Sequence, residues 1–242
     1  MKKISVVIPA LNEEQGIGAV IQQIPTEKLR AAGYETEVLV IDNGSTDRTG
    51  EIARQAGARV IVQPVRGYGN AYKAGFANAT GDIIATGDAD MTYPFDALPG
   101  ILDRMERDDL DFINTDRLSM LNPEAMSQWH LFGNRFLTTL ARWLYNWPYK
   151  DSQSGMWVFK RSIWPQLEVR SQGMPFSQEL KLEAYLKGFR NAELPIEYRV
   201  RAGEVKLSSI GDPIRTTSQL FVKRIRSVRP RRKVRELAKV AD

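Results

Sequence analysis

The sequence of 242 residues predicts an α/β fold in which a mostly parallel central sheet is flanked by helices. Three observations lead to this class. Short β-branched apolar runs alternate with helix-like patterns through the first half of the chain. The residues that follow these runs favour turns and helix starts. Hydrophobic residues make up 43% of the chain and charged residues 26%, as in ordinary globular proteins.

The first half contains four strand-like runs, which cover residues 4–10, 36–42, 58–63 and 82–87. Helices are predicted between them from apolar residues at helical spacing, over residues 12–24, 49–57 and, after a turn, within 66–81. Strand–helix alternation of this kind is typical of a parallel sheet covered by helices. Ligands collect at the carboxyl ends of the strands of such sheets.

The second half has a different pattern. Helices are predicted around residues 96–107, 124–147 and 175–188, and extended segments over 156–161 and 191–203. A turn-rich segment, PYKDSQSG, joins the second helix to the first of these extended segments. No linker precedes residue 210, so we expect one catalytic domain over residues 1–210 and a basic amphipathic C-terminal tail over 211–242.

The net charge of +5 is unevenly distributed. Nine basic residues and one acidic residue, Glu236, lie between Lys223 and Lys239, so this segment carries +8 and the remainder −3. Such asymmetry indicates a polyanionic partner for the tail. An anionic membrane surface is the expected partner, since no aromatic base-stacking pattern accompanies the charges and nucleic acid is therefore disfavoured. The alternative is a solvated tail or a helix that packs on the domain.

Several sequence features bear on location. There is no cysteine, which excludes disulfides and thiolate metal sites. The N-terminus reaches Glu13 and Glu14 too soon for a signal-peptide core, and no stretch approaches the roughly 20 apolar residues that span a bilayer. We expect a cytoplasmic protein that lies peripherally on the inner face of the cytoplasmic membrane.

Two carboxylates, Asp88 and Asp90, directly follow the fourth strand-like run. Like charges so close together repel each other unless they are solvated or share a cation. Mg²⁺ and Mn²⁺ prefer oxygen ligands and often share them with substrate phosphates. The pair therefore indicates either a metal site at the sheet edge or an incidental solvated turn. Asp42 ends the second run, where an acidic residue often binds a ribose, although Asn43, Ser45 and Thr46 around it also favour helix capping.

Four motifs in order carry a family resemblance: VVIPALNEE (6–14), VLVIDNGSTDRT (38–49), GDADMTYP (87–94) and DSQSGMWVF (151–159). Together they resemble the family 2 nucleotide-sugar glycosyltransferases, which have the GT-A fold. Within that family the chain is most similar to dolichyl-phosphate mannosyltransferases and other polyprenyl-phosphate glycosyltransferases. The resemblance covers about residues 3–210 and implies an inverting enzyme that transfers a hexose, mannose or glucose, from a GDP- or UDP-sugar to a polyprenyl phosphate.

The resemblance also implies roles for single residues. The nucleotide would be bound by Pro9, Leu11, Glu13, Val40 and Asp42. The sugar diphosphate and its Mg²⁺ or Mn²⁺ would be bound by Asp88, Ala89 and Asp90. The acceptor phosphate would contact Arg117, Arg201 and Lys206. The family often has glutamine where Thr92 stands, a stronger metal ligand, which leaves more of the metal binding to Asp90.

The chemistry of the acceptor separates the alternatives. A phosphate monoester is already ionised near neutral pH and needs positioning and charge balance rather than a strong base. Arg135, within an aromatic helix, joins the cationic set that could provide this. A soluble or glycerol-type hydroxyl acceptor would instead need a general base, for which Asp151 and Glu179 are the candidates. A non-enzymatic nucleotide-sugar or nucleic-acid binding module is the third alternative.

Overall fold

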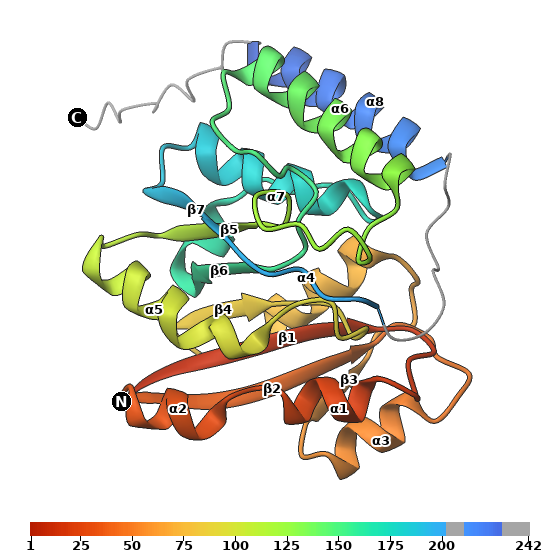
Figure 1. The fold of residues 1–242 in the computed structure, drawn as a ribbon, viewed down its shortest axis with the longest axis vertical. Helices are drawn as coiled ribbons and strands as arrows, with labels where there is room; N and C mark the ends of the chain where they lie inside the picture. The colour runs from red at the N-terminus through yellow and green to blue at the C-terminus, as the bar shows by residue number, and fades with distance from the viewer. Residues whose placement is uncertain (202–210, 229–242) are drawn as a thin grey trace, which may run out of the picture.

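A seven-stranded sheet organises the computed structural model, which describes residues 1–201 and 211–228 (Figure 1). Its strands are β1 (Lys2–Ala10), β2 (Tyr34–Asp42), β3 (Arg59–Val62), β4 (Ile83–Thr86), β5 (Phe112–Asp116), β6 (Trp157–Lys160) and β7 (Asn191–Pro195). Their spatial order is β3-β2-β1-β4-β6-β5-β7. Pairing is parallel except around β6, which runs antiparallel to both β4 and β5. The expected mostly parallel α/β sheet is confirmed.

Helices cover both faces of the sheet. They are α1 (Ile17–Gln22), α2 (Thr26–Ala31), α3 (Thr49–Gln55), α4 (Tyr68–Asn78), α5 (Leu98–Arg107), α6 (Gln128–Tyr145), α7 (Pro175–Leu186) and α8 (Gly211–Val228), with short 3₁₀ helices at Phe95–Ala97 and Arg161–Gln166. Neighbouring strand residues face opposite sides, so Val6 joins the core under α1, α2, α3 and α5, whereas Val7 joins the core under α4 and α7.

Two predicted elements are shorter than expected. The helix predicted over residues 12–24 forms only as α1, because the preceding peptides bond to the loop after β2 instead. Asn12 Oδ1 accepts from Thr46 N at 2.8 Å, and Glu13 N donates to Thr49 Oγ1 at 2.8 Å. The extended segment predicted over 191–203 pairs only as β7, after which the chain crosses toward β4, where Arg199 N donates to Thr92 O at 3.0 Å.

Two elements were not predicted. The fully buried β5 is interrupted by Asn114, Thr115 and Asp116, which hide its strand pattern, and α2 is only six residues long. The polar side chains of β5 are satisfied internally, for instance by a hydrogen bond of 2.8 Å from Asn114 Nδ2 to Glu193 Oε1. Polar residues inside a strand are stable when such partners are available.

α6 and α8 form an outer layer over α7, which itself packs on the sheet (Figure 1). Their shared apolar cluster contains Ala141, Leu182 and Leu220, and Tyr145 Oη donates to Leu220 O at 2.7 Å. Helix α8, which forms residues 211–228 of the predicted tail, therefore packs on the rest of the chain. Residues 229–242 lie outside the described residues, and the division at residue 210 stays a prediction. Within the described helices, none has the length and apolar character that crossing a bilayer requires.

The close fit of α4 on the sheet gives a stability prediction. A Cβ on Gly75 would overlap with Val7 Cγ1 and lie 3.2 Å from Ile41 Cγ1. Gly75→Ala should therefore lower the free energy of unfolding by about 1–3 kcal/mol, because the rigid strand side chains cannot yield without strain.

Gly100 offers the matched control. It lies within α5, where an added Cβ meets nothing within 4 Å. Gly100→Ala should raise the free energy of unfolding by about 0.5–1 kcal/mol through helix propensity alone. Urea unfolding of both variants measures the two effects, and equal shifts would contradict the close approach of α4 to β1.

Candidate active site

A cavity of about 300 Å³ lies at the carboxyl ends of β1 and β4. Its walls come from six segments that are distant in sequence. The lining residues are Pro9, Ala10, Leu11, Glu13, Asn43, Arg66, Gly67, Tyr68, Ala71, Asp88, Ala89, Asp90, Met174 and Arg201. The position agrees with the general rule for ligand sites in parallel sheets.

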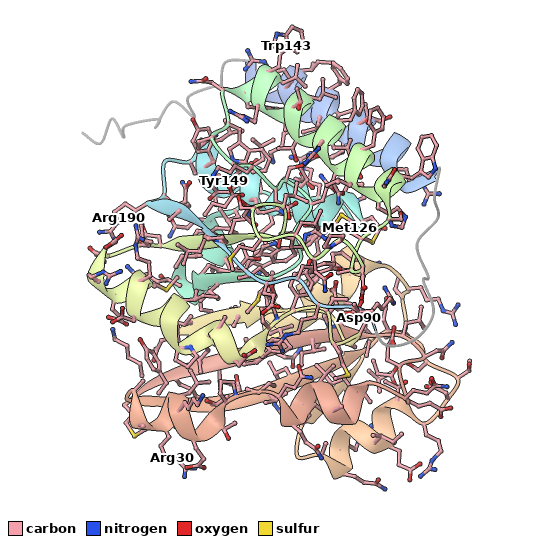
Figure 2. The ribbon with its side chains drawn as sticks, viewed as in Figure 1. Arg30, Asp90, Met126, Trp143, Tyr149 and Arg190 are labelled. Carbon is pink, nitrogen blue, oxygen red and sulfur yellow. The ribbon has the colours of Figure 1, made fainter. Side chains whose placement is uncertain are left out.

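Asp90 is held in a defined orientation at the cavity wall (Figure 2). Its Oδ1 atom accepts from Thr92 Oγ1 at 2.6 Å and from Thr92 N at 3.1 Å. Its Oδ2 atom lies 3.0 Å from the guanidinium of Arg201. Thr92, which stands where the related family often has a metal ligand, thus orients the carboxylate of Asp90 and leaves the other oxygen facing cationic partners.

Asp88 lies in a poorly hydrated part of the same wall. Burial and the neighbouring charge of Asp90 raise the pKa of Asp88 to about 7. Tyr68 and Tyr93 lie close by, and Tyr93 Oη accepts from Gly155 N at 2.6 Å. A Cβ on Gly155 would lie 2.9 Å from Tyr68 Oη and 3.4 Å from Asp88 Oδ2, so only glycine leaves room for this arrangement. The site therefore strongly favours either a proton or a cation at Asp88.

Arg201 connects two acidic residues across the cavity. Its guanidinium lies 3.0 Å from Asp90 Oδ2 and 3.6 Å from Glu13 Oε1. Arg201 follows the crossing segment after β7, and its side chain is mostly buried. A planar guanidinium at this position is suited to bind phosphate oxygens.

Arg117 and Asp151 form a buried bidentate ion pair beside the cavity. Arg117 Nε lies 2.7 Å from Asp151 Oδ2 and Nη2 lies 3.0 Å from Oδ1, while Arg117 N also donates to Oδ2 at 3.1 Å. Burial alone would raise the pKa of Asp151, but the charge and hydrogen bonds of Arg117 hold that pKa below its usual range. The guanidinium also stacks 5.2 Å from the ring centroid of Tyr198.

The turn that carries Asp151 is fixed from below by α7. The carbonyl oxygen of Ser154 accepts from Lys181 Nζ at 2.7 Å, Trp157 Nε1 at 2.7 Å and Ser177 Oγ at 3.0 Å. Lys181 is fully buried, and burial lowers its pKa to about 7. These contacts leave the turn little freedom to move relative to the sheet.

Glu179 performs a structural task on the far side of α7. Its carboxylate accepts from the backbone N of Arg170 at 3.1 Å and of Ser171 at 2.8 Å, and lies 3.5 Å from Lys223 Nζ of α8. The side chain is almost completely buried. Glu179 therefore joins α8 to the loop that leads to Met174 in the cavity wall.

The structure places the predicted site residues in three groups. Those that line the cavity are Pro9, Leu11, Glu13, Asp88, Ala89, Asp90 and Arg201. Arg117 and Asp151 form the ion pair beside it. Of the others, Val40 lies in the core, and Asp42 accepts from Ser45 N at 2.9 Å as a turn-capping residue next to the lining residue Asn43. Arg135 lies on the exposed face of α6, and Lys206 falls outside the described residues.

Several lining residues were missed from the sequence. A glycine-rich turn at the start of α4 contains Arg66, Gly67 and Tyr68, but its pattern is too weak to identify a binding motif. Gly67 has a φ of +140°, and a Cβ added to it would lie 2.5 Å from Gln172 O. This close approach explains the glycine. Asn43 could have been found because it directly follows Asp42 at a strand end. Met174 had no sequence signal.

Comparison with known proteins identifies the family. Residues 5–167 match the description Glycosyl transferase family 2. The chain is 41% identical over 213 residues to the low-salt glycan biosynthesis hexosyltransferase Agl6 of Haloferax volcanii, which covers 86% of this chain and 51% of Agl6, so the chain spans about half the length of that relative. It is 37% identical over 204 residues to a dolichyl-phosphate hexose transferase of the same organism, covering 84% of this chain and 86% of that protein.

Solved structures agree on the fold. Glucosyl-3-phosphoglycerate synthase from Mycobacterium tuberculosis, crystallised with uridine diphosphate, superimposes with a TM-score of 0.74 at 22% identity, covering 92% of this chain and 80% of that chain. The expected GT-A fold is confirmed. On the family match and the identity to these relatives, the chain belongs to glycosyl transferase family 2.

Proposed function

We propose that this enzyme transfers a hexose, mannose or glucose, from a GDP- or UDP-sugar to a polyprenyl phosphate, with inversion at the anomeric carbon. The relatives named as a hexosyltransferase and as a dolichyl-phosphate hexose transferase support this assignment. The observation that carries it is that both carboxylates considered as bases for a hydroxyl acceptor are buried and already bonded. Asp151 is paired with Arg117, and Glu179 with backbone amides and Lys223.

The donor is assigned to the cavity at the carboxyl ends of β1 and β4. Pro9 and Leu11 offer apolar contact for a base, and Asn43 and Glu13 offer polar contact. Arg201 supplies positive charge for the diphosphate from the opposite wall. A nucleotide bound there would replace the Asp90–Arg201 contact with contacts of Arg201 to phosphate oxygens.

Asp88 and Asp90 are suited to hold a divalent cation. Both present hard oxygen donors, and their mutual repulsion is the condition that a cation relieves. Among the described residues no group of three histidine, cysteine, aspartate or glutamate side chains forms a metal site, which fits an ion that completes its ligands with phosphate and water. When bound, Mg²⁺ or Mn²⁺ would supply charge neutralisation for the leaving diphosphate.

The acceptor phosphate needs orientation rather than a base. Because its second pKa is about 6, the attacking oxygen is available near neutral pH. Arg66 and Arg201 are the arginines that line the cavity among the described residues, so one can orient the acceptor phosphate while the other balances the charge of the diphosphate. Arg117 holds the adjoining turn rigid through Asp151. Arg135 on α6 and Lys206 remain further candidates. Positioning of two ionised reactants in this way supplies much of a displacement reaction's acceleration.

A hydroxyl acceptor is the second candidate. It is considered because the structurally similar glucosyl-3-phosphoglycerate synthase, 24% identical to this chain, was crystallised with glucosyl-3-phosphoglycerate. A transferase of that kind would need a carboxylate with an available lone pair near the cavity, and Asp88 is the residue whose pKa of about 7 would suit that task. The polyprenyl phosphate is favoured because Asp88 is needed beside Asp90 for the cation.

Location follows from the proposed acceptor. A polyprenyl phosphate lies in a bilayer, so we place the enzyme peripherally on the cytoplasmic face of the membrane. The basic residues from Arg224 to Lys239 support attraction to anionic headgroups. Each basic residue near an anionic surface adds about 1 kcal/mol of attraction.

Asp90→Asn tests the donor site. The amide keeps the acceptor atom for Thr92 but removes the charge, so binding of a metal–nucleotide complex should weaken. Wild-type protein with Mn²⁺ and GDP- or UDP-hexose should gain about 2.7 kcal/mol of stability at a hundredfold excess over the dissociation constant, and the variant should lose most of this gain. Thermal-shift measurements with each donor provide the readout. Asp103→Asn, at an exposed position of α5, is the control that should behave as wild type.

Asp88→Asn tests the electrostatics of the carboxylate pair. The pKa of Asp88 in the folded state, about 7, lies above its ordinary value of 3.8. Asp88 therefore lowers the stability of the folded state as the pH rises from about 4 to about 7, and this loss is complete above pH 7. In metal-free buffer the variant should be more stable than wild type by up to about 4 kcal/mol near pH 8, and by less than about 1 kcal/mol near pH 4. Urea unfolding at both pH values measures this difference, and a variant less stable than wild type near pH 8 would refute the assignment.

Asp151→Asn separates the two acceptor classes. The substitution leaves the buried charge of Arg117 without its partner, which should cost about 3–5 kcal/mol of stability. Transfer to a polyprenyl phosphate by the fraction that remains folded should fall by less than about tenfold, since no proton is abstracted there. A folded variant of wild-type stability that has lost all transfer activity would instead identify Asp151 as a base and favour a hydroxyl acceptor.

A further inference from the structure

α6 exposes a stripe of large aromatic side chains. Trp129 is 83% exposed, Phe132 67%, Phe136 54% and Trp143 78%. At about 100° per residue these four positions fall within about 60° of one another around the helix axis. The buried residues Leu137, Ala141 and Tyr145 lie on the opposite side. Trp143 marks the outer end of this stripe in Figure 2.

α8 extends the same layer with an apolar surface of its own. Phe221 is 45% exposed, Val222 37% and Ile225 61%, whereas Thr216, Leu220 and Lys223 face inward. α6 and α8 lie side by side on α7 (Figure 1). We call the outward side of these two helices the α6–α8 face. Exposed large apolar side chains that are grouped in this way mark an interaction site on a folded domain.

Exposed arginines lie on the same two helices as the aromatic residues. Arg135 and Arg142 of α6 and Arg215 and Arg224 of α8 are exposed, and Arg224 lies 5.8 Å from the ring centroid of Tyr145. α6 contains no acidic residue, and α8 contains one, Asp212, in its first turn. The chain continues beyond α8 into the basic run that begins at Arg229. Aromatic residues flanked by arginine without acidic neighbours are characteristic of helices that lie in a lipid interface.

The charges also argue against self-association. A symmetric dimer through the α6–α8 face would bring the arginines of one copy against those of the other. Like charges held together in a partly desolvated contact repel each other. Anionic headgroups complement the same charges, while the acyl chain boundary accepts the aromatic rings.

We propose that the α6–α8 face is the surface with which the enzyme enters an anionic lipid bilayer, with the four aromatic side chains of α6 inserted below the headgroups. This inference rests on the proposed function, because an enzyme that uses a polyprenyl phosphate has to meet this acceptor at a bilayer surface. It differs from attraction of a basic tail, since here apolar insertion by a folded helix provides the binding energy.

The contacts of α8 keep the face in place. Lys223 Nζ lies 2.5 Å from Glu183 Oε2 and 3.5 Å from Glu179 Oε1, and all three side chains are buried. Removing α8 from α7 would leave two buried carboxylates without this cation, which is costly. The face therefore behaves as part of the folded enzyme when it meets a bilayer.

Vesicle flotation of the full chain tests the proposal. Wild-type protein should float with phosphatidylcholine vesicles that contain phosphatidylglycerol. Trp129→Ser/Phe132→Ser/Trp143→Ser should reduce the partition coefficient by at least about tenfold, because three rings would no longer be transferred from water into the bilayer. Val62→Ser/Val65→Ser removes apolar side chains that are 62% and 61% exposed elsewhere, and should bind as wild type.

A second measurement locates the rings. Lipids brominated on the acyl chains should quench wild-type tryptophan fluorescence, whereas Trp129→Phe/Trp143→Phe should bind vesicles as wild type and lose most of the quenching. Of the three remaining tryptophans, Trp147 and Trp157 are buried, and Trp164 packs against the core between α4 and α7. Absence of wild-type flotation, equal binding by the triple serine variant, or a dimer that the serine substitutions dissociate would each overturn the proposal.

The outcome is independent of the proposed acceptor. Asp90→Asn should float as wild type while failing in transfer, whereas the triple serine variant should keep its thermal shift with Mn²⁺ and a nucleotide sugar. Flotation without any transfer to polyprenyl phosphate would reject the proposed acceptor and leave the membrane face intact.

Discussion

The repulsion between Asp88 and Asp90 is the constraint to which the rest of the cavity responds. Both carboxylates follow β4 in a part of the molecule with little water, and this shows in the raised pKa of Asp88. The surrounding structure answers with cations on two sides. Arg201 contacts Asp90 directly, and the charge of Arg117 acts on Asp88 while being held by Asp151. Charge balance here depends on residues from four separate segments, which the sheet brings to one edge.

The antiparallel strand β6 explains how those segments meet. A parallel strand would begin at the far edge of the sheet, but β6 runs opposite to β4 and β5, so its start lies at their carboxyl ends. The turn of residues 151–155 therefore reaches the cavity. Asp151 meets Arg117 there, and Gly155 meets Tyr93 and Asp88. One reversal of strand direction thus supplies the second half of the site.

Local patterns predicted the first half of the chain and its cavity well. β1, β2 and β4 each contain an apolar run, and the residues after them lie at or next to the cavity because parallel strands end at a common edge. β5 escaped prediction because its polar residues are paired by partners distant in sequence, such as Glu193. The ion pair of Arg117 and Asp151 was equally hidden, since both residues were expected to face substrate. Nothing local in a sequence reports that two charged side chains 34 residues apart neutralise each other.

The docking of α8 through Lys223 has a consequence for how substrates are found. A helix that is tied to the core by buried ion pairs transmits its orientation to the sheet, so an enzyme resting on the α6–α8 face would keep its cavity at a constant height and tilt above the lipid. Encounter with a membrane-bound acceptor then becomes a search in two dimensions by partners already aligned. The nucleotide sugar, by contrast, arrives from the three-dimensional volume of the solvent, and the two substrates reach one cavity by different kinds of diffusion.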